Sequence, residues 1–88
     1  MSRTKISEEV LAFVCISVHP REHYPRVVSD ITKMDSVKEV YGITGEYDLL
    51  VKLQAKSIRE FSEVLGKISS LSGVAKTYTM LVVDLIKP

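Results

Sequence analysis

The first part of the chain carries two successive patterns of apolar and polar side chains. Val10–Val18 is rich in β-branched and aromatic residues and predicts a β-strand, which ends at His19-Pro20. From Arg21 to Met34 the apolar positions have helical spacing, so this stretch predicts an amphipathic helix. Pro25 should lie in the first turn of that helix, where its missing N–H costs no intrahelical hydrogen bond.

The middle of the chain predicts two strands joined by a tight turn. Val37–Thr44 and Tyr47–Gln54 both have the composition of strands, and Gly45-Glu46 lies between them. Two strands separated by a pair of residues, one of them glycine, are typical of a β-hairpin. The two strands are therefore expected to be antiparallel neighbours.

A second helix and a last strand complete the pattern. Ser57 followed three residues later by Glu60 is typical of a capping box, in which each side chain satisfies a backbone N–H at the start of a helix. This helix is expected to end at Ser72-Gly73, where the helical spacing of apolar residues stops. Val74–Ile86 then predicts a long final strand.

The two halves of the chain repeat one another. When the sequence is compared with itself at an offset of 37 residues, apolar positions fall on apolar positions without a gap. Examples are Val14 with Val51, Ile16 with Leu53, and Ile31 with Ile68. Each copy has the order strand, helix, strand. The chain therefore predicts a ferredoxin-like βαββαβ fold of the α+β class, with both helices on one face of a four-stranded antiparallel sheet. Residues 1–9 are expected to form an N-terminal tail and residues 10–88 one domain.

Both faces of this sheet are predicted to be apolar. A face in contact with water should carry polar residues at every second position. The first strand instead has Ala12, Val14, Ile16 and Val18 on one side and Leu11, Phe13 and Cys15 on the other. The helices cover one face, and a second copy of the chain is the simplest cover for the other, which predicts a homodimer that pairs sheet to sheet.

Composition and charge narrow the class of protein. The 88 residues are 45% hydrophobic and 26% charged, with a formal net charge of +1, which is a normal globular balance. Acidic and basic residues are interspersed, whereas nucleic-acid binding needs a concentrated basic surface, so direct DNA binding is not expected. The chain has no apolar run near the roughly 20 residues that span a bilayer and no signal-peptide core, so we expect a cytoplasmic protein.

Few residues suggest catalysis or metal binding. Cys15 is the only cysteine, which excludes an intrachain disulfide and argues against a cysteine-based zinc site. His19 and His23 are four positions apart, but Pro20 should keep His19 outside the helix, so we expect no metal site there. The chain also lacks a glycine-rich phosphate loop and a nucleophile elbow. The sequence thus predicts neither an enzyme nor a bound cofactor.

Two short motifs resemble those of a known family. The segment Val40–Leu50 (VYGITGEYDLL) is followed, one predicted helix later, by Ser72–Thr79 (SGVAKTYT). Together they resemble the Thr-Gly-x-Tyr-Asp hairpin and the Gly-Val-x-x-Thr-x-Thr strand of the amino-acid-binding (RAM) domain of Lrp/AsnC transcription regulators. The resemblance extends over nearly the whole chain, from Val10 to Lys87, and implies the same βαββαβ fold.

The resemblance also implies a function. Such domains pair sheet to sheet, assemble into larger bodies, and bind a free amino acid in the crevice between neighbouring dimers. The matching positions are Gly45, Glu46, Tyr47, Asp48, Thr77 and Thr79. Glycine lets a ligand approach backbone amides, a carboxylate can accept from an ammonium group, and threonine hydroxyls can complete a polar ring. The same residues also suit a turn or a strand without any ligand, so both interpretations stay open at this point. A neutral or apolar amino acid is the working hypothesis for the ligand.

The chain departs from typical members of that family. They carry an N-terminal helix-turn-helix domain, whereas nine residues precede the first predicted strand here. The resemblance therefore implies a stand-alone amino-acid-sensing domain that could modulate a full-length Lrp/AsnC regulator. One alternative is a small dimeric α+β barrel enzyme, such as a cofactor-free monooxygenase or isomerase, which needs a polar cluster in its barrel. Another is an ACT-like regulatory domain, which pairs through sheet edges or helices instead of sheet faces.

Overall fold

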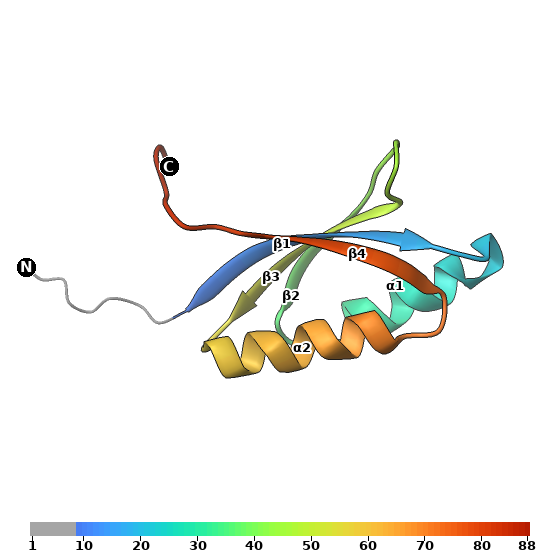
Figure 1. The fold of residues 1–88 in the computed structure, drawn as a ribbon, viewed down its shortest axis with the longest axis horizontal. Coiled ribbons are helices and arrows are strands. Elements are labelled where there is room, and N and C mark those ends of the chain that lie inside the picture. Colours follow the sequence, from blue (N-terminus) through green and yellow to red (C-terminus); the bar gives the residue numbers. More distant parts are fainter. Residues whose placement is uncertain (1–8) are drawn as a thin grey trace, which may run out of the picture.

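Four strands and two helices follow one another in the predicted order. The computed structural model describes residues 9–88, so the predicted tail lies outside the described residues except for Glu9. The elements are β1 (Val10–Val18), a 3₁₀ turn (Arg21–His23), α1 (Tyr24–Thr32), β2 (Val37–Gly42), β3 (Leu49–Ala55), α2 (Ile58–Ser70) and β4 (Val74–Leu81). The strands form one antiparallel sheet in the order β2-β3-β1-β4, and both helices lie on the same face of it (Figure 1). The ferredoxin-like α+β fold predicted from the sequence is confirmed.

The hydrophobic core lies between the sheet and the two helices. On each central strand every second residue is buried, and the two sets are related by the 37-residue repeat: Ala12, Val14, Ile16 and Val18 on β1, and Leu49, Val51, Leu53 and Ala55 on β3. The helices close the core with Val27 and Ile31 from α1 and with Phe61 and Ile68 from α2. The repeat in the sequence therefore reports the alternation that points these side chains toward the helices.

The first helix is shorter at both ends than the sequence predicts. Arg21–His23 form a 3₁₀ turn, and α1 itself spans Tyr24–Thr32. Pro25 does lie in the first turn, as predicted. At the other end the Met34 N–H donates to the Ile31 carbonyl at 3.1 Å, three residues back, so the chain tightens and leaves the α-helix before Met34.

The connection between β2 and β3 is longer than the predicted two-residue turn. β2 ends at Gly42 and β3 begins at Leu49, so the prediction of strands that reach Thr44 and restart at Tyr47 is wrong. The reason is a set of bonds at the base of the loop Ile43–Asp48. The Asp48 N–H donates across to the Ile16 carbonyl of β1 at 2.8 Å, and the Ile43 N–H donates to the Asp48 carbonyl at 3.0 Å. The loop rises from the sheet on the side away from the helices (Figure 1).

The last strand is also shorter than predicted, since it ends at Leu81 and not at Ile86. The Val82 N–H still donates to the Leu11 carbonyl of β1 at 2.9 Å. That bond lies one residue from the start of β1, which begins at Val10. A strand pattern without a neighbouring strand to pair with does not form a ladder.

The second helix begins at the predicted capping box. The Glu60 N–H donates to Ser57 Oγ at 3.1 Å. The Glu60 carboxylate reaches one residue further than in the usual box, because it accepts from the Lys56 N–H at 2.6 Å and from the buried Ser36 hydroxyl at 3.2 Å. The bond from Lys56 is the main reason why the pKa of Glu60 lies below its ordinary value of 4.5. Desolvation opposes this shift, and the Ser36 bond and the charges of Lys56 and Lys38 add to it.

Replacing Glu60 by glutamine should make the stability of the domain less dependent on acid pH. A carboxyl whose pKa is lowered by folding stabilises the fold above its unfolded pKa, and this contribution is lost as the pH falls through the folded pKa. Melting temperatures measured from pH 7 to about pH 3 should therefore converge for the wild type and Glu60→Gln at the acid end. The control is Glu63→Gln, which removes the same charge one turn later on α2. A constant gap between Glu60→Gln and the wild type at every pH would contradict this account.

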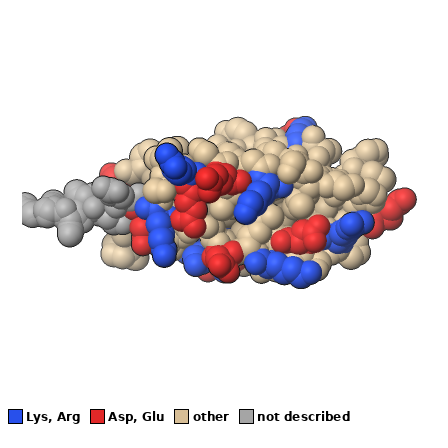
Figure 2. All heavy atoms as spheres, turned by 90° about the horizontal axis from the view of Figure 1, so that it is seen from below, with Lys and Arg blue, Asp and Glu red and all other residues tan. Residues whose placement is uncertain are grey.

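The face of the sheet away from the helices is apolar along the middle of β1 and β4, as the sequence predicts, and polar toward β2, where Lys52 lies opposite Phe13 and Glu39. Residues that oppose each other in an antiparallel sheet point to the same side. On this face, Phe13 lies opposite Met80, and Cys15 lies between Leu50 and Tyr78. Tyr78 is 55% exposed and Met80 38% exposed. The helix-covered side is different, since acidic and basic side chains alternate over its surface (Figure 2). We refer below to the side away from the helices as the open face.

Candidate ligand-binding site

Asp48 holds the base of the loop between β2 and β3. Its Oδ2 accepts from the Val18 N–H at 2.7 Å, at the point where β1 ends. Its Oδ1 lies 3.4 Å from a guanidinium nitrogen of the exposed Arg21. With its own N–H bonded to Ile16, Asp48 ties the loop to β1 through both backbone and side chain. This geometry gives Asp48 a structural role, whatever else binds at the loop.

The tip of the loop is accessible. Gly45 has a φ of +113°, a conformation that residues with a side chain rarely adopt. Apart from Gly45 and its two chain neighbours, no described residue has an atom within 4 Å of the position that a Cβ on Gly45 would occupy. Glycine is therefore favoured here by the backbone conformation, and the space beside it is open to a ligand.

The loop contacts β4 through a cluster of four side chains: Glu46, Tyr47, Lys76 and Tyr78. The rings of Tyr47 and Tyr78 stack with centroids 6.3 Å apart and an interplanar angle of 26°. Lys76 Nζ lies 5.4 Å from the centre of the Tyr47 ring and 3.3 Å from Glu46 Oε2. The register places Lys76 and Tyr78 opposite Ser17 and Cys15, so this loop–β4 cluster stands on the open face.

Thr77 and Thr79 lie on the other side of the sheet. In the register with β1 they oppose Ile16 and Val14, which are fully buried under the helices. Their side chains are therefore on the helix-covered side of the edge strand β4. Of the six residues predicted for the site, the structure brings Gly45, Glu46, Tyr47 and Asp48 together and separates the two threonines from them within one chain.

Lys76 and Tyr78 are part of the cluster although the sequence analysis did not propose them. The signal that could have found them is the alternation of the last strand. Residues two apart on a strand share a face, so Lys76, Tyr78 and Met80 belong together. The motif match selected the threonines between them, because a motif does not report the side of the sheet on which each residue lies.

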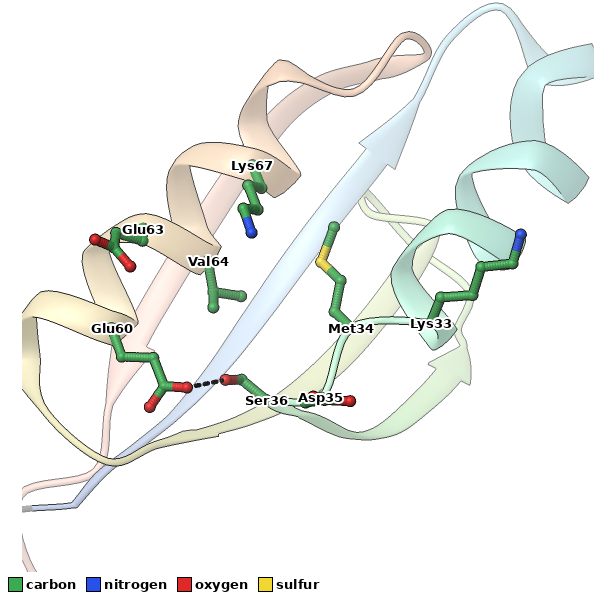
Figure 3. A pocket seen from close by; sticks show the side chains of 8 residues that line it. All are labelled: Lys33, Met34, Asp35, Ser36, Glu60, Glu63, Val64 and Lys67. Carbon is green, nitrogen blue, oxygen red and sulfur yellow. Dashed lines mark hydrogen bonds between the residues drawn. The ribbon is translucent and has the colours of Figure 1, made fainter.

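A separate cavity of about 370 Å³ lies on the helix side, between α2 and the turn that follows α1. Met34 and Val64 supply its apolar wall, and the hydrogen bond between Ser36 and Glu60 closes one end (Figure 3). The ammonium group of Lys67 points into the same space (Figure 3). The polar groups at the closed end already serve the start of α2, which gives this cavity a structural explanation.

The polar side chains on the β2 side of the open face are paired with each other. The Tyr41 hydroxyl donates to Glu39 Oε1 at 2.7 Å, and this bond is the main reason why the pKa of Tyr41 is raised. Lys52 Nζ lies 4.0 Å from the other oxygen of Glu39. His19 and His23 follow the end of β1 and lie outside the sheet. Within residues 9–88, no three His, Cys, Asp or Glu side chains are placed to hold a metal ion.

The fold and the loop–β4 cluster define a class of protein: a small ferredoxin-like domain with an accessible polar loop at one end of an apolar sheet face. The sequence matches the family of Lrp/AsnC ligand binding domains over residues 11–88. The chain belongs to this family, and the resemblance found in its two motifs is confirmed.

Transcription regulators are among its curated relatives. The HTH-type transcriptional regulator FL11 of Pyrococcus abyssi is 40% identical over 73 residues, which are 83% of this chain and 48% of the regulator. The Pyrococcus furiosus FL11 is 37% identical over 78 residues, which are 89% of this chain and 51% of that protein. The chain thus spans about half the length of these regulators. A homocitrate synthase of Saccharolobus islandicus is 33% identical over 75 residues, which are 85% of this chain and 16% of the enzyme.

Solved structures share the fold over almost the entire chain. Escherichia coli AsnC superimposes with a TM-score of 0.84 at 25% identity, over 100% of this chain and 60% of AsnC. TTHA0845 of Thermus thermophilus has a TM-score of 0.82 at 31% identity, over 90% of this chain and 99% of that one. The Neisseria meningitidis regulator NMB0573, solved in complex with L-Met, has a TM-score of 0.83 at 23% identity over 100% of this chain and 58% of its own, which shows the fold alone. Neither described helix is long and apolar enough to cross a membrane.

Proposed function

We propose that this domain is a cytoplasmic amino-acid sensor that pairs with copies of itself and has no catalytic activity. The observation that carries the proposal is the accessible loop tip at Gly45, in a chain that belongs to the Lrp/AsnC ligand-binding family. The regulator NMB0573, which shares the fold, was solved with L-Met. Free amino acids are therefore the first class of ligand to test.

The homodimer of this proposal forms through the open face. An apolar sheet surface without helices over it is stable in water when a second copy covers it. The residues that would meet across the two-fold axis are Leu11, Phe13, Cys15, Leu50, Tyr78 and Met80. The same pairing leaves the charged helix side exposed to solvent (Figure 2).

The ligand would bind between neighbouring dimers. The loop supplies Gly45, Glu46 and Tyr47 to the crevice, and Asp48 holds the loop in place. Thr77 and Thr79 lie on the other side of β4 from the loop–β4 cluster. The threonines that contact the ligand would therefore belong to a different copy of the chain, across the crevice. If one ligand molecule contacts more than one copy, a higher ligand concentration would favour the assembled state.

Co-assembly with a full-length Lrp/AsnC regulator is the proposed route to transcription. The curated regulators are about twice as long as the matched region, so such a partner could carry the DNA-binding part. The charges on the helix side of this domain are mixed in sign, which does not suit a phosphate backbone (Figure 2). The alternative of a dimeric α+β barrel enzyme requires a reactive polar cluster under the open face. On that face the charged groups described are paired with each other: Glu39 with Tyr41 and Lys52 near β2, and Glu46 with Lys76 at the loop.

A screen of the twenty amino acids by light scattering and thermal melting tests the sensor function. One or a few neutral amino acids should raise the melting temperature or the mass of the assembly, because a ligand that binds only the folded, assembled form stabilises it. Gly45→Ala should abolish the response, since it forces a side chain into a conformation with positive φ at the loop tip. Gly66→Ala, on the exposed side of α2, is the matched control. A protein that is indifferent to all twenty would end the proposal.

A further inference from the structure

The residues that follow β4 carry apolar side chains that the single chain leaves uncovered. Val83 is 91% exposed, Leu85 72% and Ile86 87%. One apolar residue at a surface is ordinary, but three within four positions form a patch of the kind that an interface covers. The Val82 N–H still bonds to β1, and the segment Val82–Ile86 then leaves the sheet on the side of the open face (Figure 1). We refer to these residues as the 82–86 segment.

The 82–86 segment keeps the pattern of a strand, although it forms no ladder within residues 9–88. Leu81 lies opposite the buried Ala12 of β1, so it points to the helix side of the sheet. Val83 and Leu85 continue that side by the two-residue repeat of a strand. A strand pattern that has no partner in its own chain can be completed at the edge of a second sheet.

The edge strand β2 offers a place for such a strand. The sheet order gives β2 a single neighbour, so its outer backbone N–H and C=O groups face no other strand of the described chain. Beside this edge lies a hollow of about 230 Å³ between β2 and the end of α1. Val37 and Val40, both half-buried, supply its apolar lining, and Thr32 supplies the part from α1. The hollow has room for an apolar side chain on the helix side of β2.

Resting on the homodimer proposed above, we infer that the 82–86 segment of each copy adds as a fifth strand to the sheet of its partner, beside β2. The partner is a second copy of this chain. Val83 and Leu85 then lie on the helix side of the partner's sheet, where the hollow beside β2 receives them. Val82 and Ile86 lie on the opposite side of the segment and extend the apolar surface between the two open faces.

The two-fold symmetry of a dimer favours β2 as the acceptor. β2 and β4 are the two edges of the sheet, and they run in opposite directions because each pair of neighbours is antiparallel. When two such sheets face each other about an axis along the strands, the β4 edge of each copy lies over the β2 edge of the other and antiparallel to it. The two segments then cover both β2 edges. A pairing of β4 with the partner's β4 would leave both β2 edges uncovered.

Cross-linking between two co-expressed, differently tagged copies tests the position of the segment. Both copies carry Cys15→Ala, so that the native thiol does not react; one also carries Val83→Cys and the other carries Lys38→Cys on β2. A short bismaleimide should join these two chains and should not join two copies of the Val83→Cys chain. The control replaces Lys38→Cys by Ser69→Cys, near the end of α2, and should give no adduct.

The strength of the homodimer provides a second test. Val83→Glu should raise the dimer dissociation constant at least about tenfold in sedimentation equilibrium, because it places a charge against an apolar hollow. Since Val83 is 91% exposed in the single chain, this variant should fold like the wild type. Val83→Ile keeps the apolar character and the preference for a strand, so it should leave the dissociation constant unchanged. Backbone amides of the 82–86 segment should exchange slowly in the wild-type dimer and rapidly in Val83→Glu.

Each contrary outcome has a separate meaning. A wild type that is dimeric but gives no adduct with Lys38→Cys, or an equal adduct with Ser69→Cys, overturns the inference and leaves the homodimer standing. A Val83→Cys chain joined to its own copy would show that β4 pairs with the partner's β4, and an unchanged dissociation constant for Val83→Glu would show that the segment lies outside the interface; both overturn the inference in the same way. A wild type that sediments as a monomer refutes the homodimer itself and the strand exchange with it.

Discussion

Phe13→Glu is expected to convert the proposed homodimer into folded monomers. Phe13 lies in the centre of the open face, opposite Met80 on one neighbouring strand and Lys52 on the other. Its side chain points away from the core under the helices, so the domain should still fold. Removing a buried aromatic residue from the middle of an interface costs about 2 kcal/mol or more, and the two-fold axis would bring two glutamates together. The dimer dissociation constant should rise by at least about thirtyfold in sedimentation equilibrium.

Ile58→Glu is the control for this experiment. Ile58 is 61% exposed at the first residue of α2, on the helix side, so the same kind of substitution there should leave the dimer intact. Cys15 offers a second readout, because it lies on the open face beside Leu50 and Tyr78. Its thiol should react slowly with a labelling reagent in the wild type and rapidly in Phe13→Glu. A wild type that sediments as a monomer, or a variant that remains dimeric, would show that the open face is not the interface.

Gly73→Ala should destabilise the fold more than the same change at the other glycines tested. Gly73 has a φ of +101°, and a Cβ there would lie 2.6 Å from the His23 Cβ and 3.0 Å from Val27 Cγ2. Both contacts involve the start of the first helical segment and the core, so neither can shift freely. Backbone strain and the collision together should cost about 3 kcal/mol. The melting temperature should then fall by more than about 10 °C.

Two further alanine variants separate strain from collision. Gly45 has a φ of +113°, and beyond its two chain neighbours no described atom lies within 4 Å of an added Cβ, so Gly45→Ala should cost about 1–2 kcal/mol from strain alone. Gly66 lies within α2 with open space beside it, and Gly66→Ala should stabilise the helix by about 0.5–1 kcal/mol. Equal melting temperatures for all three variants would contradict the order derived from the structure.

Much of the fold could be predicted because local pattern and tertiary structure agree. The two buried sets on β1 and β3 already alternate in the sequence, and Ser57 with Glu60 marks the start of α2 three residues apart. The ends of strands were harder to predict. β4 ends at Leu81, close to the point where its partner β1 begins at Val10, and an apolar pattern that continues to Ile86 contains no information about that partner.

The part of the candidate site that is local in the sequence could also be predicted. The loop residues Gly45, Glu46 and Tyr47 are close in sequence and stay together in the structure. Asp48 is predicted to contact the ligand, and its bond to the Val18 N–H adds a structural role that depends on a residue thirty positions away. Whether Asp48 also contacts a ligand remains a prediction.

The sequence by itself determined the order of elements, the two-fold repeat, the apolar character of both sheet faces and the family to which the chain belongs. These properties depend on spacing along the chain and on turn and cap residues, which act locally. The polar side chains of β2 and β3 that share the open face, Glu39 and Lys52, are placed there by the strand register. The tertiary structure decided which residues share a side of the sheet at the loop. It placed Lys76 and Tyr78 beside Glu46 and Tyr47, and it placed Thr77 and Thr79 under the helices. That outcome depends on strand register across positions far apart in the chain, because a shift of one residue exchanges the two faces.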